Sequence, residues 1–221
     1  MKKKNLKAFT LAEVLITLSI VGILAAITIP TLIAHNRKMV IKNRFKKAYS
    51  VLTTQFELAK KDYDAQPLCY YYYINNKISS KGTECWDFVI NYFFKKLNYS
   101  SYCANKSYEK GCVPNYKAKD FNSNVSGCGG FSAERIKNTN PSVVLQNGMI
   151  VFTYGAYENM PYIGIDINGK EGPNQGGIDV YSLILFKDGD TVELTAYNNS
   201  VIGCLKPANN SVFTTFTDIM K

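Results

Sequence analysis

The chain has 221 residues, of which 46% are hydrophobic and 19% are charged. This composition excludes an intrinsically disordered protein and predicts one globular domain plus an additional segment. The net charge of +9 gathers near the N-terminus, because four lysines lie within the first eight residues and a second basic cluster follows at residues 37–47. The globular part is therefore close to neutral.

The chain begins with a basic leader, residues 1–8, followed by an apolar run over residues 9–34. That run contains one charge, Glu13, and the 21 residues from Val14 to Ala34 carry none. A helix of this length spans a bilayer core of about 30 Å. A secretory signal does not fit, since its apolar region has about 7 to 15 residues. A plain anchor leaves Glu13 unexplained, because a charge in an inserting helix is costly and marks function.

The helical pattern continues through residues 35–63 as an amphipathic segment, with lysines on the face opposite its apolar stripe. The stripe recurs at spacings of three and four residues and consists of Ile41, Phe45, Ala48, Leu52, Phe56 and Ala59. Pro30 is expected to kink the helix, because proline removes a backbone hydrogen bond and clashes with the preceding turn. The sequence therefore predicts one stem of about 50 residues.

Six basic residues follow the apolar run between Arg37 and Lys47. Such a cluster can contact nucleic acid or lipid phosphates. No interleaving of aromatic and basic residues accompanies it, so a solvated or headgroup-level helix face is favoured over a nucleic-acid partner.

All six cysteines lie after the stem, and an even number is typical of disulfides in an oxidising compartment. They are Cys69, Cys85, Cys103, Cys112, Cys128 and Cys204. They include no CxxC pair, so a zinc site is not expected. Six cysteines allow 15 connectivities, among which the sequence alone does not choose. Our working hypothesis pairs the first with the second, the third with the fourth and the fifth with the sixth.

The head is predicted to begin after Tyr63, with a region of loops, disulfides and one short helix at residues 64–141. The helix is predicted over residues 84–97, where large apolar residues recur at helical spacing. The run Tyr70–Tyr73 is interpreted as packed or half-exposed strand aromatics rather than an adhesive or stacking patch.

Residues 142–221 are predicted to form an antiparallel sheet of four or five strands, which makes the fold α+β. The strands are expected at residues 142–146, 149–154, 162–167, 180–186 and 191–196. Asn147-Gly148 lies between the first two, and this dipeptide favours a type I′ hairpin turn because both residues tolerate positive φ.

A glycine-rich loop at residues 166–179, DINGKEGPNQGGID, gathers the oxygen donors Asp166, Asn168, Asn174 and Asp179 between two strands. Several carboxylate and carbonyl oxygens are what Ca²⁺ prefers, although the spacing is not that of an EF-hand. Two interpretations stay open: a calcium site, and a metal-free turn, which is favoured. No cofactor is otherwise required.

An enzyme is not expected. A cysteine nucleophile or a serine triad needs a base, and the only histidine, His35, lies at the membrane end of the stem.

The leader MKKKNLKA and the run FTLAEVLITLSIVGILAAITIP together resemble the N-terminal signal of type IV prepilins and type II secretion pseudopilins. The resemblance implies cleavage between Ala8 and Phe9 by a prepilin peptidase and N-methylation of Phe9. Glu13 then becomes the fifth residue of the mature chain, where the family keeps a glutamate that pairs with the amine of a neighbouring subunit, and Pro30 falls at a common kink position. Ala8 departs from the usual glycine, which implies slower cleavage.

The resemblance also implies a structural role and a location. The protein would be a single-pass protein of the bacterial inner membrane, with its head extracytoplasmic, and then a subunit of an extracellular or periplasmic filament. Its partners would be the peptidase, other pilin or pseudopilin subunits, an inner-membrane assembly platform and the lipid bilayer. The alternative is a membrane-anchored binding protein that does not polymerise. Lysine and arginine counts on the two sides of the helix oppose this orientation, whereas the cysteines favour it.

Overall fold

The computed structural model describes residues 9–63, 69–75, 77–82, 85–117, 132–157, 160–196 and 216–221. Ala8, Cys128 and Cys204 lie outside the described residues. The chain divides into two compact units, residues 1–40 and residues 41–221. From here on we call the whole second unit the head, although it includes residues 41–62 of the predicted stem.

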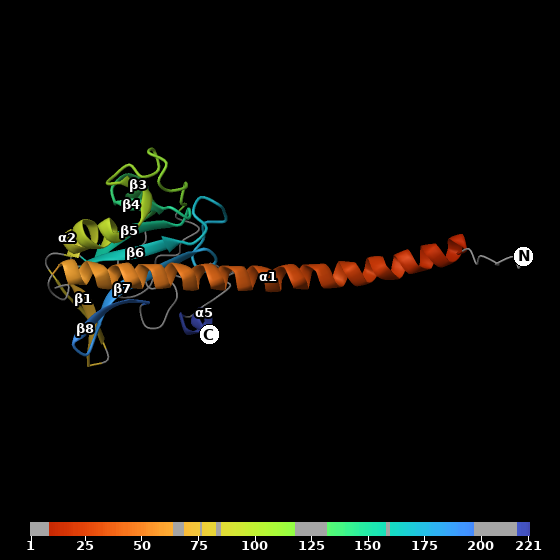
Figure 1. Cartoon of the computed structure of the whole chain (residues 1–221), viewed down its shortest axis with the longest axis horizontal. Helices are drawn as coiled ribbons and strands as arrows, with labels where there is room; N and C mark the ends of the chain where they lie inside the picture. Colours follow the sequence, from red (N-terminus) through yellow and green to blue (C-terminus); the bar gives the residue numbers. More distant parts are fainter. Residues whose placement is uncertain are drawn as a thin grey trace, which may run out of the picture. The chain divides into compact units, whose positions relative to one another are not determined.

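Helix α1 (Leu11–Asp62) forms the stem predicted from the sequence, with 52 residues in one continuous helix (Figure 1). Lys60 and Lys61 lie in its last turn, where positive charge is favourable beside the unpaired carbonyls. Pro30 lies inside the helix without interrupting it, so the kink stays a prediction.

The head contains an eight-stranded sheet, more than the four or five strands predicted. The strand order is β2-β1-β7-β6-β5-β4-β3, and β8 also pairs with β7. The bounds are β1 (Tyr70–Ile74), β2 (Lys77–Lys81), β3 (Tyr99–Cys103), β4 (Ser142–Leu145), β5 (Ile150–Tyr157), β6 (Met160–Asp166), β7 (Val180–Asp188) and β8 (Thr191–Thr195). The last five are the predicted strands, and the fold is α+β as expected.

The additional strands lie at the two ends of this order. Strands β2 and β3 are edge strands with polar sequences, and the first four residues of β3 are all exposed. A strand that is not buried on one face lacks the alternation that sequence analysis detects. Strand β1 pairs in parallel with β7 through Tyr71 and Phe186, so the sheet is mixed rather than wholly antiparallel.

The turn between β4 and β5 differs from the predicted type I′ turn. The amide of Gly148 donates to the carbonyl of Leu145 at 2.9 Å, and the amide of Leu145 donates to Met149 O at 2.8 Å. Gly148 has φ +84°, whereas Asn147 is not among the residues with positive φ. This is a three-residue hairpin loop in which glycine alone takes the left-handed conformation.

Five short helical segments complete the described head. The helix predicted over residues 84–97 is present as α2 (Cys85–Asp87), a π-helix η1 (Phe88–Phe93) and α3 (Phe94–Lys96). Helix α4 (Ala133–Asn138) begins after Ser132, whose side chain accepts a hydrogen bond from the amide of Arg135 at 3.2 Å, and α5 (Phe216–Met220) lies near the C-terminus.

The core of the head forms where the apolar stripe of α1 meets the other elements. All six stripe residues predicted from their spacing are buried. The Phe45 ring packs edge-on against Tyr181 of β7, with centroids 4.9 Å apart. The Phe56 ring lies 5.7 Å from the rings of both Phe88 and Phe93. The C-terminal part of α1 is therefore a core element of the head (Figure 1).

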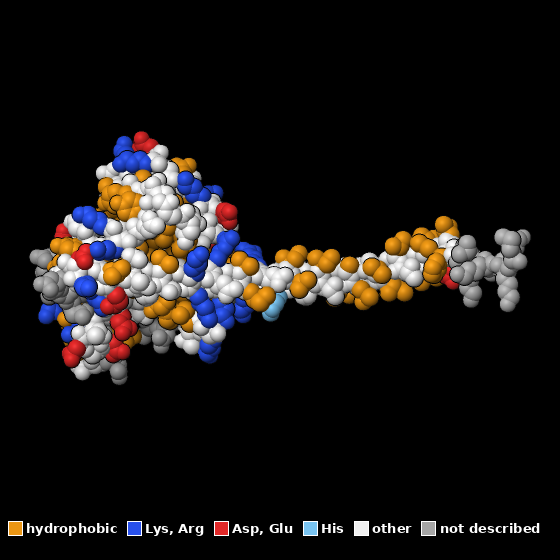
Figure 2. Space-filling model, in the orientation of Figure 1, with side chains coloured by type: hydrophobic (Ala, Val, Ile, Leu, Met, Phe, Trp, Pro, Cys, Tyr) orange, Lys and Arg blue, Asp and Glu red, His pale blue; other side chains and the backbone are white. Residues whose placement is uncertain are grey.

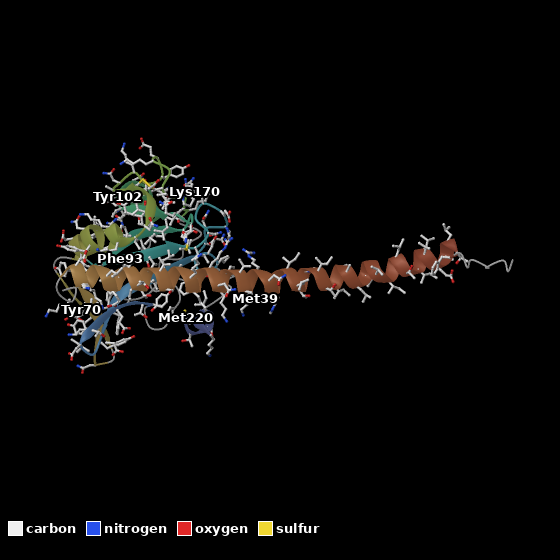
Figure 3. All side chains as sticks on the ribbon, viewed as in Figure 1. Met39, Tyr70, Phe93, Tyr102, Lys170 and Met220 are labelled. Carbon is white, nitrogen blue, oxygen red and sulfur yellow. A yellow bond between two sulfur atoms is a disulfide. The ribbon has the colours of Figure 1, made fainter. Side chains whose placement is uncertain are left out.

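One of the three hypothesised disulfides is present, between Cys103 and Cys112, with their Cα atoms 6.3 Å apart. Cys69 and Cys85 are instead two buried thiols without a bond between them. The Sγ of Cys85 occupies the space in front of Gly82, where a side chain is missing. Figure 3 shows the side chains of the described head on the ribbon.

We predict that Phe56→Ala lowers the free energy of unfolding of the head by about 3–5 kcal/mol, because it empties a site enclosed by two other rings. Urea unfolding of the detergent-solubilised chain, followed by near-UV circular dichroism, measures this change. Leu58→Ala is the matched control on the same helix: Leu58 is 44% exposed, so a change within about 0.5 kcal/mol is expected. Equal effects of the two substitutions would contradict the packing described here.

Candidate functional site

The first turn of α1 is closed by reciprocal hydrogen bonds between Thr10 and Glu13. The amide and the hydroxyl of Thr10 each donate to Glu13 Oε2 at 2.9 Å, and the amide of Glu13 donates to Thr10 Oγ1 at 3.3 Å. This arrangement is a capping box, in which a threonine before the helix and a glutamate three residues later satisfy free amide groups. The sequence Thr-Leu-Ala-Glu carries this signal, which sequence analysis missed.

Both capping residues follow the expected cut between Ala8 and Phe9. Thr10 and Glu13 would therefore keep their hydrogen bonds in a chain that begins at Phe9. Glu13 thus has a local structural role in a single chain, besides any role between chains.

The apolar side chains of residues 9–40 are exposed along the whole N-terminal unit (Figure 2). Phe9 is 85% exposed and Leu11 81%. Helix α1 is long and apolar enough to cross a membrane, and the window that meets this test has none of its residues buried. Exposed apolar area of this extent is unfavourable in water and marks a surface that lipid or other protein covers.

The glycine-rich loop between β6 and β7 brings the four predicted oxygen donors together. The hydroxyl of Tyr116 donates to Asp166 Oδ2 at 2.8 Å. The amides of Asn174 and Gln175 donate to the two carboxylate oxygens of Asp179 at 2.8 and 2.6 Å. Both carboxyl groups are buried. Tyr116 is a member of this cluster that sequence analysis did not identify.

The two asparagines complete the cluster. With its amide nitrogen facing the surrounding acceptors, Asn174 donates to Asp166 Oδ2 at 3.0 Å, Gly169 O at 3.0 Å and Glu171 O at 3.1 Å. Without a metal, these three oxygens thus receive hydrogen bonds from one amide nitrogen. Two further buried oxygens, Asp166 Oδ1 and Asn168 Oδ1, have no hydrogen-bond partner.

The residues of the loop fit a hard divalent cation. Asp166 and Asp179 would balance a charge of two, Asn168 Oδ1 and Asp166 Oδ1 are buried oxygens with free lone pairs, and oxygen ligands are those that Ca²⁺ takes. Within the described residues no group of three or more His, Cys, Asp or Glu side chains could hold a metal. Neutral oxygens would therefore supply the rest of the coordination.

Burial changes the protonation of the two acids. Desolvation, with the negative charge of Asp179 as the next cause, raises the pKa of Asp166 well above its ordinary value. Desolvation also raises the pKa of Asp179, against the opposing effect of its amide donors. Two buried carboxyl groups that disfavour ionisation are stabilised either by a proton or by a cation.

A comparison with protein families matches residues 3–29 to the prokaryotic N-terminal methylation motif. This motif is the prepilin-type signature of type IV pilins and pseudopilins. The comparisons with curated proteins and with solved structures find no match. Together with the long N-terminal helix and the sheet of the head, the motif makes the fold pilin-like and points to a structural subunit rather than an enzyme.

We predict that, with divalent cations chelated, the head loses stability as pH rises from about 4 toward neutral. The folded state holds the proton of Asp166 more tightly than the unfolded chain does, so raising the pH favours unfolding. Asp166→Asn keeps an oxygen that accepts the hydrogen bond of Tyr116 but cannot ionise, so it should reduce the loss of stability as pH rises. The urea midpoint of the solubilised chain across this pH range measures it.

Asp188→Asn is the control, since Asp188 is an exposed acid at the end of β7. A pH profile of Asp166→Asn that matches the wild type would rule out the assignment of the proton to Asp166. Added Ca²⁺ provides a separate readout at pH 7. A melting temperature that ignores both Ca²⁺ and chelator means a metal-free loop.

Proposed function

We propose that the chain is a structural subunit of a type IV pilus-like or type II secretion filament. It is inserted into the inner membrane, cut between Ala8 and Phe9 by a prepilin peptidase, methylated at Phe9 and polymerised through its N-terminal helix. The observation that carries the proposal is the methylation motif at residues 3–29 on a helix none of whose apolar side chains before residue 41 is buried.

Packing between stems would cover this apolar surface once the helix leaves the lipid. Residues 9–34 present apolar side chains all around the helix, so several neighbours can be accommodated at once. Contacts that use different surfaces of the two partners and do not close generate open helical filaments. The same apolar surface of the stem would thus contact lipid before assembly and neighbouring stems in the centre of the filament afterwards.

The orientation with the head outside the cytoplasm is supported by the disulfide between Cys103 and Cys112. Disulfides form and persist in oxidising compartments and are rare in the cytosol. The basic residues after the helix oppose this orientation by simple counting. The disulfide carries more weight, because a reduced compartment would not keep it.

Glu13 is proposed to pair with the methylated amine of Phe9 in a neighbouring subunit. A carboxylate among apolar stems is unfavourable unless a positive charge lies beside it, so the pair favours one axial register. Within its own chain, Glu13 Oε2 accepts the two hydrogen bonds of the capping box from Thr10. The amine of the neighbouring subunit would be an additional partner of the same carboxylate.

Calcium binding at the loop of Asp166 and Asp179 is a second proposal, independent of assembly. It is supported by the two buried oxygens without partners and the two uncompensated carboxyl groups. A bound cation would fix the connection between β6 and β7.

We expect the mature protein to begin with N-methylated Phe9. Mass spectrometry of the intact chain, isolated from cells with an active prepilin peptidase, measures the loss of residues 1–8 and the added methyl group. Ala8→Gly should raise the processed fraction, because glycine is the usual residue before the cut. An intact Met1 in such cells would instead favour the anchored binding protein that does not polymerise.

Two substitutions at Glu13 separate its two roles. Glu13→Gln keeps a side-chain oxygen for the Thr10 amide but removes the charge, whereas Glu13→Ala removes both. If the charge pair sets the register, both variants insert into the membrane and both lose most filament formation, as counted by electron microscopy of sheared fractions. Normal assembly of Glu13→Gln with defective Glu13→Ala would assign the effect to the helix cap alone.

A further inference from the structure

The hairpin of β1 and β2 is joined to the rest of the described sheet by little backbone pairing. Its two strands pair with each other over five positions, from Tyr70 with Lys81 to Ile74 with Lys77. Between β1 and β7 there is one paired position, Tyr71 with Phe186. A hairpin of two strands is marginal in water by itself, so this one depends on other contacts for its place.

Cys69 and Cys85 lie at the base of this hairpin, on the two chain segments that enter and leave it. Cys69 directly precedes the paired residue Tyr70, and Gly82 directly follows its partner Lys81. Cys85 is the first residue of α2. A covalent bond between the two cysteines would therefore tie the open end of the hairpin to the helical segment that starts at Cys85.

The space in front of Gly82 brings the two side chains together. A Cβ placed on Gly82 would lie 2.5 Å from Cys69 Cβ and 2.8 Å from Cys85 Sγ. Both atoms thus border one side-chain-sized space, and these two distances place Cys85 Sγ no more than 5.3 Å from Cys69 Cβ. Glycine at position 82 leaves the room that a bond between them needs.

We propose that Cys69 and Cys85 form a second disulfide of the head, which fixes the tyrosine-rich hairpin β1–β2 to α2. Both thiols are buried, and the other two described cysteines are already bonded to each other. The disulfide of Cys103 and Cys112 shows that the head is compatible with oxidising conditions.

The chemistry requires an oxidant of the exported compartment. Two thiols lose two protons and two electrons as the sulfur–sulfur bond forms. A disulfide-bonded oxidoreductase accepts the electrons and becomes a dithiol, through a mixed disulfide with one of the two cysteines.

Burial sets the order of events. Desolvation raises the pKa of the Cys85 thiol to about 12, so the folded head presents very little of the thiolate that attacks a disulfide. Oxidation is therefore expected to be easier before folding buries the two thiols.

Peptide mapping of the full-length chain tests the proposal. Membranes are denatured in urea that contains N-ethylmaleimide, so that any free thiol is exposed and blocked, and the protein is then digested with trypsin without reductant. The expected product is a peptide of residues 62–77 linked to one of residues 82–95, which separate on reduction. Recovery of both peptides carrying the maleimide would overturn the proposal, as would a link from either one to Cys128 or Cys204.

Melting temperatures of variants give a second readout. Cys69→Ser, Cys85→Ser and the double variant should lower the melting temperature of the head by the same amount, about 6–12 °C, because each removes one bond that closes a short loop. Effects of the single variants that add up in the double variant would indicate two independent packing roles and no bond. Neither readout depends on filament formation, so the disulfide and the proposed function can fail separately.

Discussion

Helix α1 carries two apolar surfaces, and the chain itself buries only one of them. From Ile41 to Ala59 a narrow stripe at spacings of three and four residues is covered by the sheet and by the helical segment Cys85–Lys96. From Phe9 to Val40 apolar side chains point outward on every side. No rearrangement of a single stem helix covers such a surface, because burial of a full circumference needs partners on all sides. The exposed apolar surface of residues 9–40 therefore has to be covered by lipid or by other protein chains. The proposed role in a membrane and then in a filament rests on this constraint.

The polar groups of the protein follow a related rule, which is that charge in a poorly solvated place needs a partner. Glu13 has its partner within the first turn of α1, where Thr10 closes a capping box. Asp166 and Asp179 have donors from the hydroxyl of Tyr116 and from backbone amides, but no basic partner within the described part of the chain. Neutral donors satisfy hydrogen bonds without balancing charge, so the loop retains a preference for a proton or a cation. Among the residues that the structure describes, both acidic sites thus have hydrogen-bond donors but no basic side chain that balances their charge.

Hydrophobic spacing predicted the stem, all six residues of its buried stripe and the five strands after residue 141, since these segments bury apolar side chains in the head. The same method missed the polar edge strands β2 and β3. The first four residues of β3 are exposed, so that strand has no buried face to detect. The hairpin turn was predicted at the right residues with the wrong geometry, because Asn147-Gly148 suits two turns and the register of β4 with β5 selects between them. The parallel pairing of β1 with β7 joins segments more than a hundred residues apart, which no local pattern encodes.

The sequence by itself determined the long apolar helix and the methylation motif, because both are patterns along one continuous segment of the chain. It also identified the oxygen donors of the loop and the cysteines by residue type. Only the tertiary structure decided which of them meet: it placed Tyr116 beside Asp166, converged three oxygens on Asn174, and brought Cys69 and Cys85 to the same space in front of Gly82. The physical reason is that spacing along a helix is fixed by local geometry, whereas contacts across a sheet depend on which strands pair and in which register.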